Sequence, residues 1–331
     1  MIVSRTPFRI SFFGGGSDYP AWYTKYGGKV IGTTIDKYCY ISCRYLPPFF
    51  TYKHRIVYSN MEYVNDISEI KHPAVQGILK SFKTEKGLEI HHDGDLPARS
   101  GLGSSSSFTV GLLHSLHALE GKFTSKRDLA LEAMHIEQDV LSENVGSQDQ
   151  ILAAYGGFNT VEFHPTGNFD VHPVILPKER LTHFQQHLML CFTGITRIAS
   201  TIAKSHIENL EKRKREIQLM QQMTNEAISV LQSETASIEE FGRLLNEYWE
   251  YKKSLSDKVT TPEVDEIYKA AREAGAIGGK LLGAGGGGFM IFFAKPEIQR
   301  KIRERLKNLV HVGFRFDFSG SKIVVYEPYN F

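Results

Sequence analysis

Glycine is concentrated at three places far apart in this chain of 331 residues. The places are the triplet Gly14–Gly16, a Gly-Leu-Gly turn at 101–103, and Gly283–Gly288, where five of six residues are glycine. Glycine loses more conformational freedom on folding than any other residue, so such runs are costly unless something must pass close to the backbone. For Gly283–Gly288 two explanations stand equal: a close crossing of helix and strand, or the approach of a ligand.

The segment Pro97–Ser107, with the sequence PARSGLGSSSS, predicts an anion site. It follows an expected strand, Leu88–His92, and leads into an expected amphipathic helix, Ser104–Leu119. First-turn amides of a helix lack internal partners and the helix dipole is positive there, so a phosphate is stabilised. A capped helix is the alternative, but four serines exceed what a cap requires. A serine hydroxyl here could also reach a metal ion.

Well-known nucleotide motifs do not describe this chain. The pattern GxxxxGK[ST] is missing, as are the HRD and DFG segments of protein kinases. Gly283–Gly288 formally matches GxGxxG, but an expected helix, Pro262–Ala274, precedes it and an expected strand, Phe289–Ala294, follows. A dinucleotide-binding loop has the reverse order of strand and helix.

Two charged residues mark the N-terminal glycine segment. Arg9 interrupts an otherwise apolar strand, Ile2–Phe13, and should therefore be paired or bound to an anion. Asp18 follows the glycine triplet, where its carboxylate could meet sugar hydroxyls or cap the turn.

Length and composition limit the organisation of the chain. With 331 residues the chain exceeds the size of one typical core, so we expect two domains, 1–180 and 181–331, β-rich first and α+β second. The net charge of +2 argues against a general nucleic-acid surface. Three cysteines, Cys39, Cys43 and Cys191, form no disulfide framework or zinc pattern.

No segment suggests a membrane protein. The longest apolar run, Gly285–Ala294, is too short to span a bilayer, and Arg5 and Arg9 interrupt any secretory signal at the N-terminus. We therefore expect a cytoplasmic protein with neither a membrane nor a nucleic-acid partner. Whether it forms a homodimer is left open.

Three segments resemble the motifs of the galactokinase, homoserine kinase, mevalonate kinase and phosphomevalonate kinase family, the GHMP kinases. They are Pro7-x-Arg9-Ile10 through Asp18-Tyr19, Pro97-x-x-x-Gly101-Leu102-Gly103-Ser104-Ser105, and Lys280-Leu281-x-Gly283 through Gly288, in the family's order. The resemblance implies an α+β, two-domain fold, N-terminal ribosomal-S5-domain-2-like and C-terminal ferredoxin-like. It also implies ATP in the cleft between the domains.

The resemblance assigns roles to individual residues. Asp149 matches the catalytic base and Arg9 the arginine beside it, while Glu137 matches the Mg²⁺ carboxylate, with Asp139 as the competing choice. Ser105 matches the Mg²⁺ serine, with Ser104 and Ser106 left open. The residues expected to bind ATP are Pro97, Ser100, Gly101, Leu102, Gly103, Ser104, Ser105 and Ser106. Those expected to bind the acceptor are Gly15, Gly16, Ser17, Asp18, Gly285 and Gly286.

The run Gly14–Pro20 is most similar to the fucokinase and heptose 7-phosphate kinase branch, whereas galactokinase has Glu-His at Gly15 and Gly16. The resemblance implies transfer of the ATP γ-phosphate to the anomeric hydroxyl of D-glycero-D-manno-heptose 7-phosphate. The 1,7-bisphosphate would supply nucleotide-activated heptose for surface polysaccharide. The alternatives are a kinase for fucose, galactose or an N-acetylhexosamine, and a non-catalytic ATP-binding sugar sensor. Arg99, Lys37 and Arg197 are candidates for binding the substrate phosphate.

Overall fold

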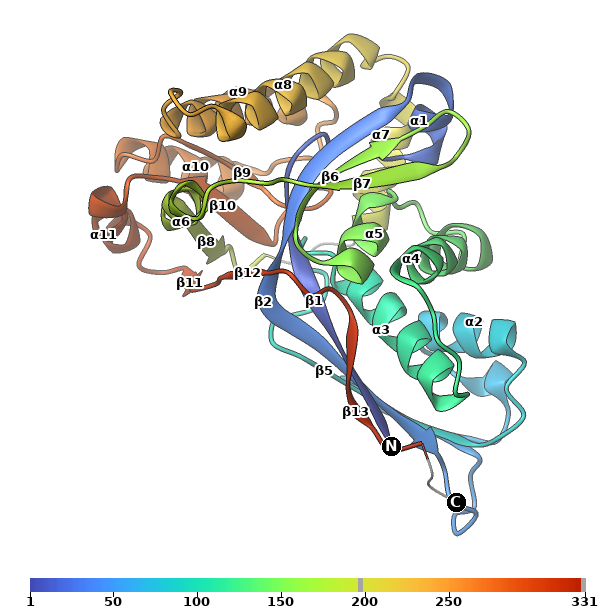
Figure 1. The fold of residues 1–331 in the computed structure, drawn as a ribbon. Coiled ribbons are helices and arrows are strands. Elements are labelled where there is room, and N and C mark those ends of the chain that lie inside the picture. The colour runs from blue at the N-terminus through green and yellow to red at the C-terminus, as the bar shows by residue number, and fades with distance from the viewer. Residues whose placement is uncertain (196–198, 329–331) are drawn as a thin grey trace.

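The computed structural model describes residues 1–195 and 199–328 (Figure 1). No helix in these ranges has both the length and the apolar character needed to cross a bilayer. The strands are β1 Ile2–Phe13, β2 Gly28–Tyr45, β3 His54–Val57, β4 Met61–Val64, β5 Leu88–Gly94, β6 Phe158–Phe163, β7 Phe169–Pro173, β8 Leu188–Phe192, β9 Gly278–Leu281, β10 Phe289–Phe293, β11 Val310–Val312, β12 Phe316–Asp317 and β13 Lys322–Tyr326. The α-helices are α1 Pro20–Tyr26, α2 Pro73–Phe82, α3 Ser104–Leu119, α4 Lys126–His135, α5 Gln148–Tyr155, α6 Lys178–Gln186, α7 Ala199–Asn209, α8 Lys214–Gln232, α9 Glu239–Ser254, α10 Pro262–Glu273 and α11 Pro296–Arg305. A 3₁₀ turn, η1 Ile67–Glu69, and a π-helical turn, η2 Ile136–Val140, complete the elements.

The larger sheet is built around the long antiparallel pair β1 and β2. Its main path is β13-β1-β2-β5-β3-β4, with β6 and β12 also paired to β2 and β7 paired to β6. Helix α3 packs on β1 and β2, and α4 and α5 pack on α3, so helices cover one face of this sheet (Figure 1). The end of β1 from Pro7 to Phe13 is buried at every residue, which places Arg9 in the interior.

The smaller sheet has the order β11-β8-β10-β9 and is antiparallel throughout. Aromatic side chains join it to the larger sheet. Phe12 of β1 contacts Phe184 of α6 and Phe241 of α9, with ring centroids 5.6 and 5.5 Å apart, and Phe184 contacts Phe293 of β10 at 6.1 Å. Such aromatic contacts add to the burial of large apolar side chains, so one hydrophobic cluster runs through both parts. A second cluster, which includes Met290 and Phe292, lies on the other face of the smaller sheet.

The end of the chain returns to the first sheet. Phe316 of β12 pairs with Ile35 of β2, and Ile323 of β13 pairs with Ser4 of β1. These strands supply partners to backbone groups that would otherwise be unpaired at the sheet. The division at residue 180 stays a prediction, but the segment from residue 316 onward is structurally part of the first unit rather than the second.

Several expected elements differ from those observed. The sequence predicts one long helical stretch over Ile195–Leu231, but a turn at 210–213 divides it into α7 and α8, and its residues 196–198 lie outside the described part. The sequence also predicts an amphipathic helix over Lys126–Leu141, and the structure changes to π-helical geometry at Ile136. Strand β9, which has two glycines in four residues, was not expected and separates α10 from the glycine run. Also unpredicted were the short elements α1, α5, α6, β4 and β7.

Candidate active site

The second and third glycine segments lie directly against each other. A Cβ added at Gly101 would be 2.6 Å from the carbonyl oxygen of Leu282, and one at Gly283 would be 2.6 Å from Gly101 Cα. The Phe289 amide donates to the Ser100 carbonyl at 2.9 Å, and a Cβ at Gly288 would be 2.3 Å from that same oxygen. The two backbones therefore come so close that only glycine fits at these positions. The close contact expected for Gly283–Gly288 is between two loops rather than between a helix and a strand.

Arg9 and Asp149 form a bidentate ion pair beside this contact. Arg9 Nε donates to Asp149 Oδ1 at 2.7 Å, and Nη2 donates to Oδ2 at 2.6 Å. The third guanidinium nitrogen, Nη1, donates to the Gly101 carbonyl at 2.6 Å. Arg9 is 4% exposed and the Asp149 side chain 25%, so the carboxylate is held from the interior and faces the pocket. This geometry orients Asp149 and ties it to the serine-rich loop.

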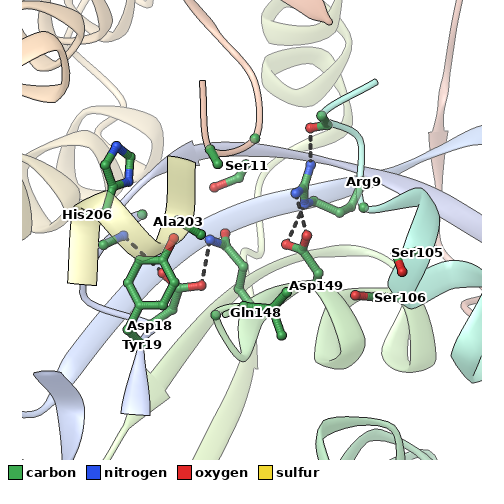
Figure 2. A pocket seen from close by; sticks show the side chains of 18 of the residues that line it. Arg9, Ser11, Asp18, Tyr19, Ser105, Ser106, Gln148, Asp149, Ala203 and His206 are labelled. Carbon is green, nitrogen blue, oxygen red and sulfur yellow. Dashed lines mark hydrogen bonds and ion pairs between the residues drawn. The ribbon is translucent and has the colours of Figure 1, made fainter. Parts of the chain in front are cut away.

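Asp18 lies on one side of Asp149, and Ser105 and Ser106 lie on the other (Figure 2). Asp18 Oδ1 accepts from the Gly16 amide at 3.0 Å, and Oδ2 accepts from Gln148 Nε2 at 2.8 Å. Burial, and secondarily the charge of Asp149, raise the pKa of Asp18 above its ordinary value. The pocket therefore has an acid-lined end and a serine-lined end, with Asp149 between them.

Glu137 is buried behind the serine-lined end. Its Oε2 accepts from the Ser106 hydroxyl at 2.9 Å and from Gln150, while its Oε1 has no hydrogen-bond partner among the described residues. Burial raises the pKa of Glu137 to about 7. An unpartnered, fully buried carboxylate oxygen beside a hydroxyl fits a hard cation such as Mg²⁺.

Ser106, rather than the expected Ser105, contacts Glu137. Ser105 is exposed in the pocket, and the Ser104 hydroxyl accepts from the Arg99 amide at 3.1 Å. The competing carboxylate Asp139 lies on the surface, paired with His135. No cluster of three or more His, Cys, Asp or Glu suited to a metal occurs in the described ranges, so these oxygens would need help from a ligand or water.

Two buried lysines that the sequence reasoning gave no role also line the pocket. Lys252 of α9 donates to the carbonyls of Leu281 at 2.9 Å and Gly283 at 2.6 Å. Lys280 of β9 donates to the carbonyls of Ser11 and Phe12, both at 2.9 Å. Burial, and secondarily the Arg9 charge, lower the pKa of Lys252 to about 7. The lysines fasten the third motif to α9 and to β1.

Not all expected site residues reach the pocket. Those that line it are Arg9, Gly15, Gly16, Asp18, Gly101, Gly103, Ser104, Ser105, Ser106 and Asp149. Seven others lie outside its lining: Pro97, Ser100, Leu102, Ser17, Glu137, Gly285 and Gly286.

Contacts with neighbouring protein atoms explain why some of these residues lie outside the pocket lining. The Gly286 amide donates to the Val259 carbonyl at 2.9 Å, and a Cβ at Gly285 would be 2.7 Å from Val259 Cα, so this turn packs on protein backbone. Leu102 and Ser17 are fully buried, and the Ser17 hydroxyl bonds to the Gly14 carbonyl. Gly285 and Gly286 therefore lie outside the pocket lining, and their contact with the acceptor stays a prediction.

The lining also contains residues that were not among those expected to bind ATP, Mg²⁺ or the acceptor. They are Ser11, Tyr19, Asn144, Val145, Gly146, Gln148, Ala203, His206, Tyr248, Lys252, Leu255, Lys280, Gly283 and Ala284. Among the phosphate candidates, Arg99 lines the pocket, Lys37 bonds to Asp36 away from it, and Arg197 lies outside the described residues.

Comparison with known proteins places this geometry in a family. The model of the GHMP kinase N-terminal domain matches residues 69–157, and that of the GHMP kinase C-terminal domain matches residues 227–311. The D-glycero-alpha-D-manno-heptose 7-phosphate kinase of Campylobacter jejuni is 30% identical over 97% of both chains. The L-fucokinase/L-fucose-1-P guanylyltransferase of Bacteroides fragilis is 26% identical over 92% of this chain and 36% of its own length.

Solved structures agree on the fold. A D-glycero-D-manno-heptose 1-phosphate kinase from Bacteriodes thetaiotaomicron superposes with a TM-score of 0.78 at 24% identity, covering 97% of this chain and 98% of the other. Lactococcus lactis galactokinase complexed with galactose superposes with a TM-score of 0.75 at 18% identity, covering 97% and 94%. The expected α+β fold of two GHMP kinase domains is confirmed. The chain belongs to the GHMP kinase family and is a phosphotransferase of the sugar-kinase type, with an alcohol group as acceptor.

Proposed function

We propose that this protein phosphorylates the anomeric hydroxyl of D-glycero-D-manno-heptose 7-phosphate with ATP and forms the 1,7-bisphosphate. The observation that carries the chemistry is Asp149, fixed by Arg9 between a serine-lined end and an acid-lined end of one pocket. The substrate assignment rests on the 30% identity to a heptose 7-phosphate kinase, which extends over nearly the full length of both chains.

Asp149 acts as the general base. It takes the proton from the anomeric hydroxyl as that oxygen forms a bond to the γ-phosphorus, and the bond between the γ-phosphorus and the β–γ bridging oxygen breaks to release ADP. An anomeric hydroxyl is more acidic than an ordinary alcohol, so the base need only be well placed. Arg9 holds both carboxylate oxygens and leaves Asp149 one orientation toward the acceptor.

The serine-lined end receives the triphosphate. GHMP kinases use ATP as the phosphate donor, and the amides at the start of α3 have no partners within the helix, so they favour an anion. Gly101 and Gly103 have φ of +83° and +73° and keep the loop free of side chains that would block this approach. Glu137 and Ser106 would hold Mg²⁺, with Ser105 as a further hydroxyl facing the pocket; the ion would neutralise charge on the triphosphate.

The test is a coupled ADP-release screen with purified protein. The panel contains D-glycero-D-manno-heptose 7-phosphate, the free heptose, fucose, galactose and an N-acetylhexosamine. We expect kcat/KM to be highest for the heptose 7-phosphate, by about a hundredfold over the free heptose, since a site built for a phosphate rejects an acceptor without it. ³¹P NMR should then show a second phosphate coupled to the anomeric proton.

Other outcomes separate the alternatives. A preference for fucose, galactose or an N-acetylhexosamine would support the anomeric kinase activity but would change the assigned substrate. ATP binding without ADP release for any sugar would favour a non-catalytic sensor. The D149N variant serves as the matched control, because it should bind ATP but release ADP more slowly by a factor on the order of 10²–10⁴.

A further inference from the structure

His206 is a buried polar group that the mechanism above does not use. It lies on α7, is 5% exposed, and its Nε2 has no hydrogen-bond partner among the described residues. Its side chain nevertheless lines the pocket. A buried nitrogen left without a hydrogen-bond partner destabilises the protein, so such a group beside a binding pocket points to a partner that arrives with the ligand.

The position of His206 identifies which ligand it meets. In Figure 2 the imidazole stands at the end of the pocket that contains Asp18 and Tyr19, and Asp149 separates this end from Ser105 and Ser106. The serine-lined end suits the triphosphate, so the acid-lined end is left for the acceptor. Ala203, one turn earlier on α7, and Leu255 give the pocket wall around His206 an apolar character.

The chemistry at this end favours a hydroxyl over a phosphate. Burial, and secondarily the charge of Lys252, lower the pKa of His206 to about 4, so the ring is neutral near pH 7. A neutral imidazole has one donor and one acceptor nitrogen, which matches a hydroxyl group. Asp18, whose carboxylate is already held by Gly16 and Gln148, would repel a phosphate but accept from a hydroxyl.

We propose that His206 is a specificity-determining residue, whose imidazole forms a hydrogen bond with a non-reacting hydroxyl of the acceptor sugar. This inference rests on the proposed function only in requiring a sugar at the acid-lined end. It does not depend on which sugar that is. The substrate phosphate then lies elsewhere, away from the His206–Asp18 end.

The test combines side-chain variants with deoxy sugars. H206F keeps the ring volume but removes the nitrogen, and H206Q keeps an amide nitrogen near the same place. The acceptor is the sugar that wild type uses best in the screen, together with its monodeoxy analogues. We expect H206F to lower kcat/KM by about 10- to 100-fold, chiefly through KM, and H206Q to recover most of it.

One deoxy analogue decides the matter. For the analogue that lacks the contacted hydroxyl, wild type should show the same loss as H206F with the full sugar, and H206F should add no further loss. If the loss of kcat/KM caused by H206F and the loss caused by the missing hydroxyl multiply for every deoxy analogue, His206 does not contact the sugar. This result would overturn the role of His206 and leave the kinase activity intact. If the wild-type enzyme prefers another sugar, only the substrate assignment changes. The His206 comparison is then made with that sugar and its deoxy analogues. Turnover of no sugar at all would end both proposals.

His54 supplies the matched control. It is 1% exposed, also has an unpartnered Nε2, and lies on β3 outside the pocket lining. H54Q should therefore leave KM for every sugar unchanged. Thermal unfolding of each variant checks that the protein is folded, and a rise in KM for H54Q equal to that of H206F would mean that His206 acts through general stability instead.

Discussion

Arg9 and Asp149 lie 140 positions apart in the chain and meet through two parallel hydrogen bonds of 2.7 and 2.6 Å. Arg9 comes from the fully buried end of β1, and Asp149 from the first turn of α5. The same guanidinium reaches the Gly101 carbonyl at 2.6 Å. One buried cation thus sets the position of the proposed base relative to the proposed phosphate loop.

The D149N variant should retain ATP binding and lose turnover by on the order of 10²–10⁴, because an amide cannot take the hydroxyl proton. Steady-state kinetics gives kcat, and titration with a fluorescent ATP analogue gives the dissociation constant. Turnover close to wild type would remove Asp149 from the mechanism.

The R9K variant should lower kcat on the order of 10²-fold, because an ammonium cannot bond both carboxylate oxygens and the Gly101 carbonyl at fixed angles. R44K is the control, since Arg44 makes an arginine–carboxylate contact with Glu89 away from the pocket. An unchanged rate in R9K would reduce Arg9 to a structural ion.

The E137Q variant should raise the Mg²⁺ concentration needed for half-maximal activity by at least about tenfold, since a neutral amide is a poorer ligand for a hard cation. D139N should leave the Mg²⁺ dependence unchanged because Asp139 is on the surface with His135. If the two variants exchange behaviour, Asp139 is the ligand and Glu137 is not.

The contact between the glycine loops can be tested by comparing G283A with G121A. Both glycines have φ of +71°, but a Cβ at Gly283 meets Gly101 Cα at 2.6 Å, whereas one at Gly121 meets nothing within 4 Å. Backbone strain is therefore matched, and we expect G283A to lower the free energy of unfolding by about 1–3 kcal/mol more than G121A. Equal losses in urea denaturation would mean that the loops separate readily.

Acid should destabilise wild type more than H206Q. The pKa of His206 falls from 6.5 to about 4 on folding, so between these values the unfolded chain binds more protons than the folded protein. The stability due to neutral His206 is complete above pH 6.5 and is lost as pH falls through about 4. The gap between wild type and H206Q should therefore change by up to about 3 kcal/mol between pH 7 and pH 4. Parallel stability curves would show that His206 is not buried as described.

Regular, strongly patterned elements were predictable from the sequence. The limits expected for Ile2–Phe13 and Ser104–Leu119 are those observed, since alternation and an apolar stripe are local signals. α5 was missed because it has only eight residues, and β9 because glycines obscure its pattern. Its strand character comes from pairing with β10, which is a tertiary interaction.

The site residues, like the secondary-structure elements, were predictable where the sequence signal was local and not where the position depends on packing. The family resemblance named Arg9 and Asp149, and the structure brings them into contact. Lys252 and His206 come from helices whose facing surfaces depend on packing, so local sequence gave them no role. A signal was present in each case, because His206 follows Ile202 and Ala203 on a buried stripe of α7, and Lys252 lies on the buried face of α9.

The most direct measurement is a crystal structure with a nonhydrolysable ATP analogue, Mg²⁺ and heptose 7-phosphate. The triphosphate should lie on the amides of residues 101–106, Mg²⁺ should bind at Glu137, and the anomeric hydroxyl should lie within hydrogen-bond distance of Asp149. A triphosphate bound away from the serine-rich loop, or an anomeric hydroxyl remote from Asp149, would contradict the proposed mechanism.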